Sequence, residues 1–205
     1  MVGTQVVPFL DANDYKPLHL IDQACLNVAV RLVDAPVLDV KTIRLWDESN
    51  LGVHATMLEA VRSVYVRDSK DLRELQELER VRTECLVHLI FGACFNQPLT
   101  KGDLPDTVSH LTFGRNFNQA LTAGVLPDTL THLIFGDDFN QALTEGVLPG
   151  SLTHLNFGRR FNKALTEGVL PNTLTHLTFS WYFNRTLTEG VLPTTLTHLT
   201  FGSHF

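Results

Sequence analysis

The sequence predicts an α/β solenoid, that is, a right-handed stack of about eight coils with one parallel β-sheet, mostly non-helical return segments and a small helical N-terminal cap. Two observations predict it. The phrase LTHLxFGxxFNxALTxGVLPxT recurs with a constant step of 22 residues, and an apolar-x-x-apolar-x-apolar template opens each recurrence. A unit of this length cannot close a hydrophobic core alone, so successive units must stack. The histidines that mark the step are His88, His110, His132, His154, His176 and His198.

The first predicted region, residues 1–36, precedes the repeats. Apolar residues between Asp14 and Leu32 predict one or two helices. Since the ends of a solenoid need a cover, we expect these helices to cap its amino-terminal end.

Residues 37–85 are predicted to form two irregular coils. Their templates are Val40-x-x-Ile43-x-Leu45 and Val61-x-x-Val64-x-Val66. Helical periodicity appears at 55–61 and again from Ser69 to Arg82, where Ser69 is the expected cap.

Residues 86–205 are predicted to form the regular coils. Each template is expected to be one short strand, since alternate residues of a strand face opposite sides and the apolar ones then point inward. A recurrent glycine should end each strand, and the Leu-Pro pairs favour an extended return segment. The chain stops at Phe205, midway through a coil. We therefore expect either a shortened product or an end that another subunit covers.

Two further columns of the repeat are expected to be structural. Phenylalanines such as Phe117, Phe139 and Phe161 should form a continuous spine, and the asparagine after each should bond to loop backbone of its own and adjacent coils. An identical residue in every coil is what stacking demands, so scaffolding is favoured over ligand contact.

Composition excludes several functions. A formal charge of −6 provides no basic field, so no nucleic-acid partner is expected. No segment approaches the length of a membrane span, the first residues do not form a signal peptide, and the three cysteines show no paired spacing. We expect an intracellular, cytoplasmic protein without cofactors. No nucleophile motif or phosphate-binding loop is present, so the sequence does not predict an enzyme.

The histidine column is the most conspicuous chemistry of the repeat. The third template position points away from the core, which places six imidazoles in a row on the exposed sheet face. A metal site needs converging ligands, which a linear row does not provide, so no metal is predicted. We expect instead a ladder of stacked or hydrogen-bonded neutral rings. Neighbouring like charges should lower their pKa values below about 6.5.

The pair of residues after each strand varies most between coils, and we expect partner specificity there. Aromatic residues and arginine dominate many binding interfaces. Because Arg115, Asp137 and Arg159 alternate in sign on adjacent coils, an equally open alternative is that these three residues only pair with one another. The candidates are Arg115, Asp137, Asp138, Arg159, Arg160, Trp181 and Tyr182. Arg44 and Tyr65, on the irregular coils, could extend the same surface.

The Phe-Asn columns, the Leu-Pro-x-x-Leu-x-x-Leu stretch and the 22-residue step resemble the FNIP repeat family. These are leucine-rich-type repeats known chiefly from social amoebae and from giant viruses of amoebae. The nearest motif is FNQPL at residues 95–99, and later coils depart from it as FNQAL, FNKAL and FNRTL. The resemblance implies a leucine-rich-repeat-like fold and an interaction surface, and no reaction.

Residues 6–33 resemble the second half of an F-box, through Val7-Pro8-Phe9-Leu10-Asp11 and the apolar positions that follow. That resemblance implies docking to a ubiquitin-ligase adaptor. The opening helix of an F-box would precede Met1, so a plain helical cap is the competing interpretation.

The function expected from these features is protein binding, with a partner held on the sheet face and adjacent rim. Two alternatives stay open. One is a structural or self-assembling component, for example of a virion, and the other is an F-box-type substrate receptor of a ubiquitin ligase.

Overall fold

The computed structural model describes residues 38–39, 63–82 and 86–205. The chain divides into two units between Val33 and Asp34, and all described residues belong to the second. The predicted N-terminal cap, the F-box-like segment, Arg44 and the helix predicted at 55–61 lie outside the described residues.

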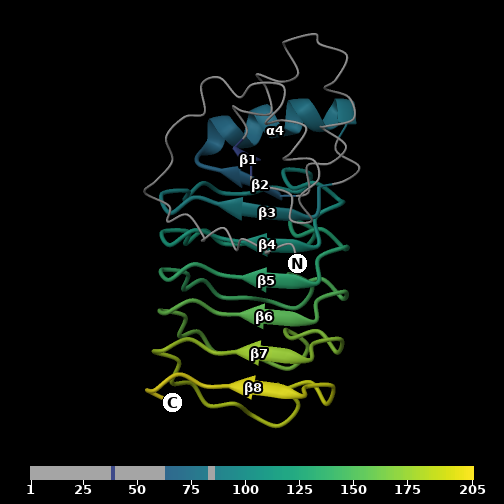
Figure 1. Cartoon of the computed structure of the whole chain (residues 1–205). Helices are drawn as coiled ribbons and strands as arrows, with labels where there is room; N and C mark the ends of the chain where they lie inside the picture. Colours follow the sequence, from purple (N-terminus) through teal and green to yellow (C-terminus); the bar gives the residue numbers. More distant parts are fainter. Residues whose placement is uncertain (1–37, 40–62, 83–85) are drawn as a thin grey trace, which may run out of the picture. The chain divides into compact units, whose positions relative to one another are not determined.

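The described part contains one eight-stranded parallel sheet whose strands follow chain order (Figure 1). Histidine stands opposite histidine and leucine opposite leucine in each neighbouring pair from β3 to β8. These six strands give six regular coils, and residues 88–205 contain no helix. The predicted solenoid with a parallel sheet and non-helical return segments is confirmed. The strands are β1 (Leu38–Asp39), β2 (Ser63–Val66), β3 (His88–Phe91), β4 (His110–Thr112), β5 (His132–Ile134), β6 (His154–Asn156), β7 (His176–Thr178) and β8 (His198–Thr200).

The first irregular strand differs from its prediction. The template aligned Ile43 with Val64, but Leu38 stands in register with Val64 and Asp39 with Tyr65. Apolar spacing alone was a poor guide here, because a coil of irregular length gives no fixed step from which to count.

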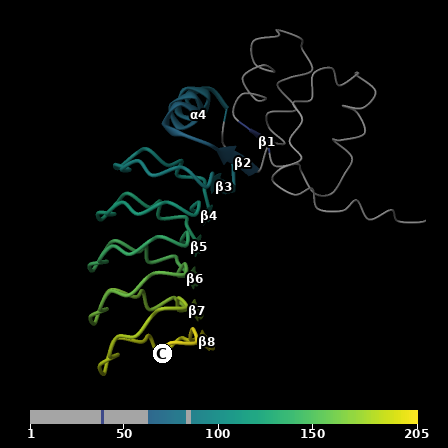
Figure 2. The ribbon, with the colours of Figure 1, turned by 90° about the vertical axis from the view of Figure 1, so that its left-hand side faces the viewer.

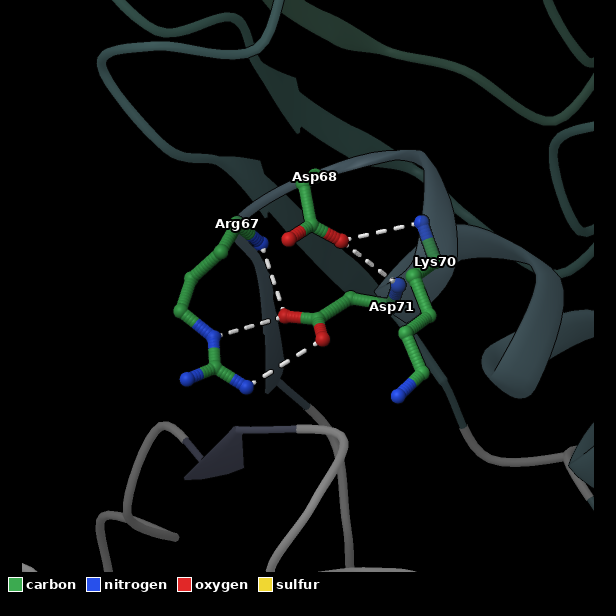
Figure 3. Close-up of polar contacts among 4 residues, drawn as sticks. All are labelled: Arg67, Asp68, Lys70 and Asp71. Atoms are coloured by element: carbon green, nitrogen blue, oxygen red, sulfur yellow. Dashed lines mark hydrogen bonds and ion pairs between the residues drawn. The ribbon is translucent and has the colours of Figure 1, made fainter.

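Helix α4 (Ser69–Arg82) has the predicted bounds. Its cap is not Ser69 but Asp68, whose Oδ1 accepts the N–H groups of Lys70 at 2.9 Å and Asp71 at 3.0 Å (Figure 3). The first helical bond, from Leu72 N–H to the Asp68 carbonyl, confirms this start. Asp71 in turn is 2 % exposed and accepts both the backbone N–H and the guanidinium of Arg67.

Helix α4 packs at one end of the stack through its apolar side and one polar contact. Leu72 and Leu75 are buried in the core that the coils share. At the end of the stack where α4 lies (Figure 2), Gln76 donates from Nε2 to the carbonyl and the carboxylate of Asp103, at 3.1 Å each, in the first regular return segment.

The core of the regular coils contains two columns of phenylalanine rather than one spine. Within a coil the two rings stack at centroid distances such as 3.9 Å for Phe135 and Phe139. Between coils, Phe139 and Phe161 stack at 6.1 Å. Leucine and valine from the strand and the return segment fill the remaining interior.

The asparagine column joins consecutive coils. Oδ1 of each asparagine accepts the backbone N–H of the asparagine one coil later, at 2.9 Å from Asn118 to Asn96 and 3.0 Å from Asn162 to Asn140. Each coil therefore uses its own asparagine as an acceptor for the next.

Glycines after the strands let the coils approach closely. A Cβ built on Gly136 would lie 1.8 Å from the carbonyl oxygen of Gly114, and one on Gly158 would lie 1.9 Å from that of Gly136. In the last coil, a Cβ on Gly202 would lie 2.2 Å from the carbonyl oxygen of Ser180. Ser180, which interrupts this column, is buried and donates its hydroxyl to the Phe161 carbonyl.

Candidate functional site

The six repeat histidines lie side by side on the outer face of the sheet. From His110 to His198, neighbouring rings stack 4.1 Å apart with interplanar angles of 7 to 12°. The pair of His88 and His110 is tilted by 39° at 4.3 Å. The strand register therefore imposes a nearly parallel stack of imidazoles.

Each ring from His110 onward has a hydroxyl partner from the residue before it. His132 Nδ1 lies 2.8 Å from Thr131 Oγ1, and His154 Nδ1 lies 2.8 Å from Thr153 Oγ1. The Thr153 hydroxyl also lies 3.1 Å from the Thr131 carbonyl of the previous coil. Because the Thr153 hydroxyl donates its one hydrogen to that carbonyl, it accepts the hydrogen bond from His154 Nδ1–H, and Nδ1 is therefore the protonated nitrogen of the ring.

The surroundings of the column favour neutral rings. Burial, followed by the nearby His132, His88 and His154, lowers the pKa of His110 from 6.5 to about 4. Burial and then neighbouring imidazoles also lower the pKa of His132, His154 and His176. Neutral imidazoles can stack without repulsion between like charges.

The stack is unsuited to metal binding. Nearly parallel ring planes direct their nitrogen lone pairs in parallel, whereas a metal ion requires ligands that converge on one point. Within residues 38–39, 63–82 and 86–205, no group of three or more His, Cys, Asp or Glu side chains is placed to hold a metal ion.

The rim beyond the carboxyl ends of the strands carries the variable pairs. Consecutive turns are joined by backbone hydrogen bonds, from Asp138 N–H to Arg115 O, from Arg160 N–H to Asp137 O and from Tyr182 N–H to Arg159 O. Variable side chains are thus displayed on a regular backbone.

Four of the predicted rim residues pair with one another. Arg160 lies 3.0 Å from Asp138, and Arg115 lies 3.9 Å from Asp137. All four are surface side chains, and such pairs contribute little to the free energy of unfolding. The interpretation of internal pairing applies to these four residues.

Arg159, Trp181 and Tyr182 are arranged differently. No carboxylate lies within ion-pair distance of Arg159 among the residues that the structure describes; its guanidinium carbon lies 5.7 Å from the centroid of the Tyr182 ring. Trp181 is 49 % exposed and Tyr182 42 % exposed. Tyr182 stacks on His204 at 5.2 Å, while Trp181 meets that ring edge-on at 5.9 Å.

A surface depression of about 460 Å³ lies at the carboxyl ends of β5, β6 and β7. Ile134, 45 % exposed, and Trp181 contribute its exposed apolar surface, and Asn156, Asp137 and Arg159 contribute polar groups. Buried phenylalanines, Gly158 and the buried Ser180 complete the lining. The depression brings together three of the seven predicted rim residues.

Sequence reasoning missed Ile134 and Asn156. Both occupy the outward position at the end of a strand, where the other regular coils carry threonine or isoleucine. That variation was a signal of the same kind as the rim pairs. Tyr65, which was predicted to extend the surface, is half-buried on β2. Its hydroxyl lies close over Gly92, since a Cβ built on that glycine would be 2.7 Å from it.

Two further predictions concern the described part of the chain. Cys94, in the rim turn after β3, carries a free thiol. Among the described residues, no helix is both long and apolar enough to cross a membrane.

Comparison with known proteins places the repeats in a family. Solved structures include one similar to this chain, the crystal structure of CroV588 from a giant virus, described as a novel circular LRR protein, at 58 % identity and a TM-score of 0.59. The similarity covers 61 % of this chain and 18 % of that one, so this chain matches only a small part of CroV588. Curated proteins gave no match. The model of the FNIP repeat matches residues 95–138, 139–181 and 161–204, more than half of the sequence, and the chain therefore belongs to the FNIP repeat family.

Proposed function

We propose that the chain is a protein-binding scaffold whose partner occupies the depression at the carboxyl ends of β5, β6 and β7. The observation that carries the proposal is the presence of exposed Ile134 and Trp181 beside Arg159, which has no carboxylate partner among the described residues. Exposed aromatic and arginine side chains in a recess are typical of residues that dominate binding energy. The proposal is of binding alone, without a catalytic step.

The division between constant and variable positions supports this function. Phenylalanine, leucine and glycine recur at positions that are buried or closely approached by the next coil. The side chains that differ between coils lie on the outer strand ends, on the rim and at exposed positions of the return segments. A repeat scaffold of this kind can vary its surface without altering its core.

Site-specific photo-crosslinking in a lysate of the native source tests the proposal. A photoreactive residue at position 156, at the centre of the depression, should capture one protein. The capture should be lost when Arg159→Ala and Trp181→Ala are added. The same photoreactive residue at exposed position 172, beyond the amino ends of the strands, is the control. Equal capture from positions 156 and 172, or capture that survives both alanine substitutions, would refute the proposal.

Self-association is the second candidate. The similarity to CroV588, a protein described as a circular LRR structure, supports it. Sedimentation of the full chain over a concentration series tests it. A mass that rises with concentration supports self-association, and a constant monomer mass removes it.

A further inference from the structure

We infer that the occupant of the depression is an extended acidic segment of a protein, with an apolar residue on each side of its carboxylate. This inference rests on the proposed function and adds the chemical class of the partner.

The charge of the rim favours an acidic occupant. The five charged rim residues of the coils of β4, β5 and β6 are three arginines and two aspartates, a surplus of one positive charge in a chain whose formal charge is −6. Arg160 lies 3.0 Å from Asp138, and Asp137, which also lines the depression, lies 3.9 Å from Arg115. Arg159 carries the surplus, and its planar fork can bind a carboxylate through two parallel hydrogen bonds.

The apolar walls set the spacing of the occupant. Ile134 belongs to the coil of β5 and Trp181 to that of β7, two coil steps or ~10 Å across the sheet, and Trp181 also lies three residues beyond Thr178, the position equivalent to Ile134. An extended chain covers ~13 Å in four residues and turns residues i, i+2 and i+4 to the same side. A peptide running obliquely across the strands would therefore place apolar residues four positions apart, with the acidic residue midway between them facing the coil of Arg159.

Asn156 favours a peptide over an isolated anion. It lies on β6, between the two walls, and is exposed in the lining. A side-chain amide both donates and accepts, which matches the alternating carbonyl and N–H groups of an extended backbone. A simple anion bound to Arg159 would leave both the donor and the acceptor of this amide without a partner, whereas a peptide backbone could pair with both.

Synthetic peptides test the inference with the full chain. The probe is a fluorescently labelled peptide, Gly-Ser-Leu-Ser-Asp-Ser-Leu-Ser-Gly, and its binding is followed by anisotropy. Three comparison peptides replace the aspartate by asparagine, the aspartate by lysine, or both leucines by serine. A labelled single-stranded oligonucleotide of equal length is included, because a polyanion could also use Arg159.

The acidic peptide should bind, and the asparagine peptide should bind about fivefold more weakly, a loss in keeping with one exposed ion pair. The lysine and serine peptides should bind more weakly still. Arg159→Ala should remove the difference between the aspartate and asparagine peptides. Arg160→Ala, the neighbouring arginine that pairs with Asp138, should preserve it.

Other results overturn the inference. One is equal binding of the aspartate and asparagine peptides. Another is an equal loss of acidic-peptide binding in Arg159→Ala and Arg160→Ala. The third is binding of the oligonucleotide without binding of the acidic peptide. If no peptide binds while crosslinking from position 156 still depends on Arg159 and Trp181, the chemistry inferred here is wrong and the proposed function stands. If the acidic peptide binds as expected but crosslinking fails, the proposed function is wrong.

Discussion

Single glycines set how closely the coils approach. The sequence predicted that they end the strands, and they do, but chain reversal was only part of the reason. Gly114, Gly136 and Gly158 have no positive φ, and a side chain on the latter two would overlap the backbone of the preceding coil. The close approach of one glycine to the backbone of the preceding coil depends on the distance between coils. The repeat length in the sequence does not give that distance.

Gly136→Ala is expected to lower the free energy of unfolding by at least about 2 kcal/mol, because the coils must separate to admit a methyl group. Gly150→Ala is the matched control, since a Cβ there meets nothing within 4 Å. It should change stability by less than about 1 kcal/mol. Urea unfolding monitored by circular dichroism measures both, and similar midpoints for the two variants would contradict the packing argument.

At the scale of the element, helix α4 shows what periodicity can and cannot predict. Its bounds followed from the apolar spacing of its sequence, whereas its cap was assigned one residue too late. Asp68 and Ser69 are both good capping residues, so the backbone conformation decides between them.

Asp68→Ala should destabilise the helix by about 1 kcal/mol, since the N–H groups of Lys70 and Asp71 lose their acceptor. Ser69→Ala should have an effect within about 0.5 kcal/mol. Hydrogen exchange of amides in α4 reports the difference. A larger loss of protection in Ser69→Ala would restore the original assignment of the cap.

The histidine column is an element with its own pH dependence. Above about pH 6.5 the imidazoles of His110, His132, His154 and His176 are neutral in both the folded and the unfolded chain, so pH does not change stability through them. Below it, the unfolded chain binds protons that the column resists, so the free energy of unfolding falls until pH approaches the folded pKa, about 4 for His110.

The melting temperature should therefore fall between about pH 7.5 and about pH 5.5, a range above most carboxylate titration. A variant with glutamine at His110, His132 and His154 should show a shallower fall, because these side chains cannot gain a proton. Parallel pH profiles for the two proteins would show that the column does not cause the dependence.

At the scale of the molecule, the repeat made the topology predictable. A constant step over many units admits one simple arrangement, in which equivalent residues stand side by side, and the sheet has that register. The arrangement of charges on the rim was less predictable. Alternation suggested a line of Arg115, Asp137 and Arg159, yet Asp138 pairs with Arg160, because long side chains choose partners by their rotamers.

Protection from hydrogen exchange should be graded along the stack. In β5, Leu133 is 1 % exposed and both edges of the strand are paired, while in β8 Leu199 is 39 % exposed. Local opening requires less free energy at the end of a stack than in its interior. Peptide-resolved exchange by mass spectrometry should find β8 exchanging well before β5, and equal rates would show that the stack opens as one unit.

The asparagine column has a consequence for variation in length. In each interior coil the asparagine donates its backbone N–H to the asparagine Oδ1 of the preceding coil, and its own Oδ1 accepts the corresponding N–H of the next coil. Duplication of an interior 22-residue unit would therefore lengthen the stack by ~4.8 Å while giving every coil an equivalent neighbour. A duplicate placed between β5 and β7 would also move Ile134 away from Trp181. Change in copy number could thus alter which partner is recognised without requiring a new core.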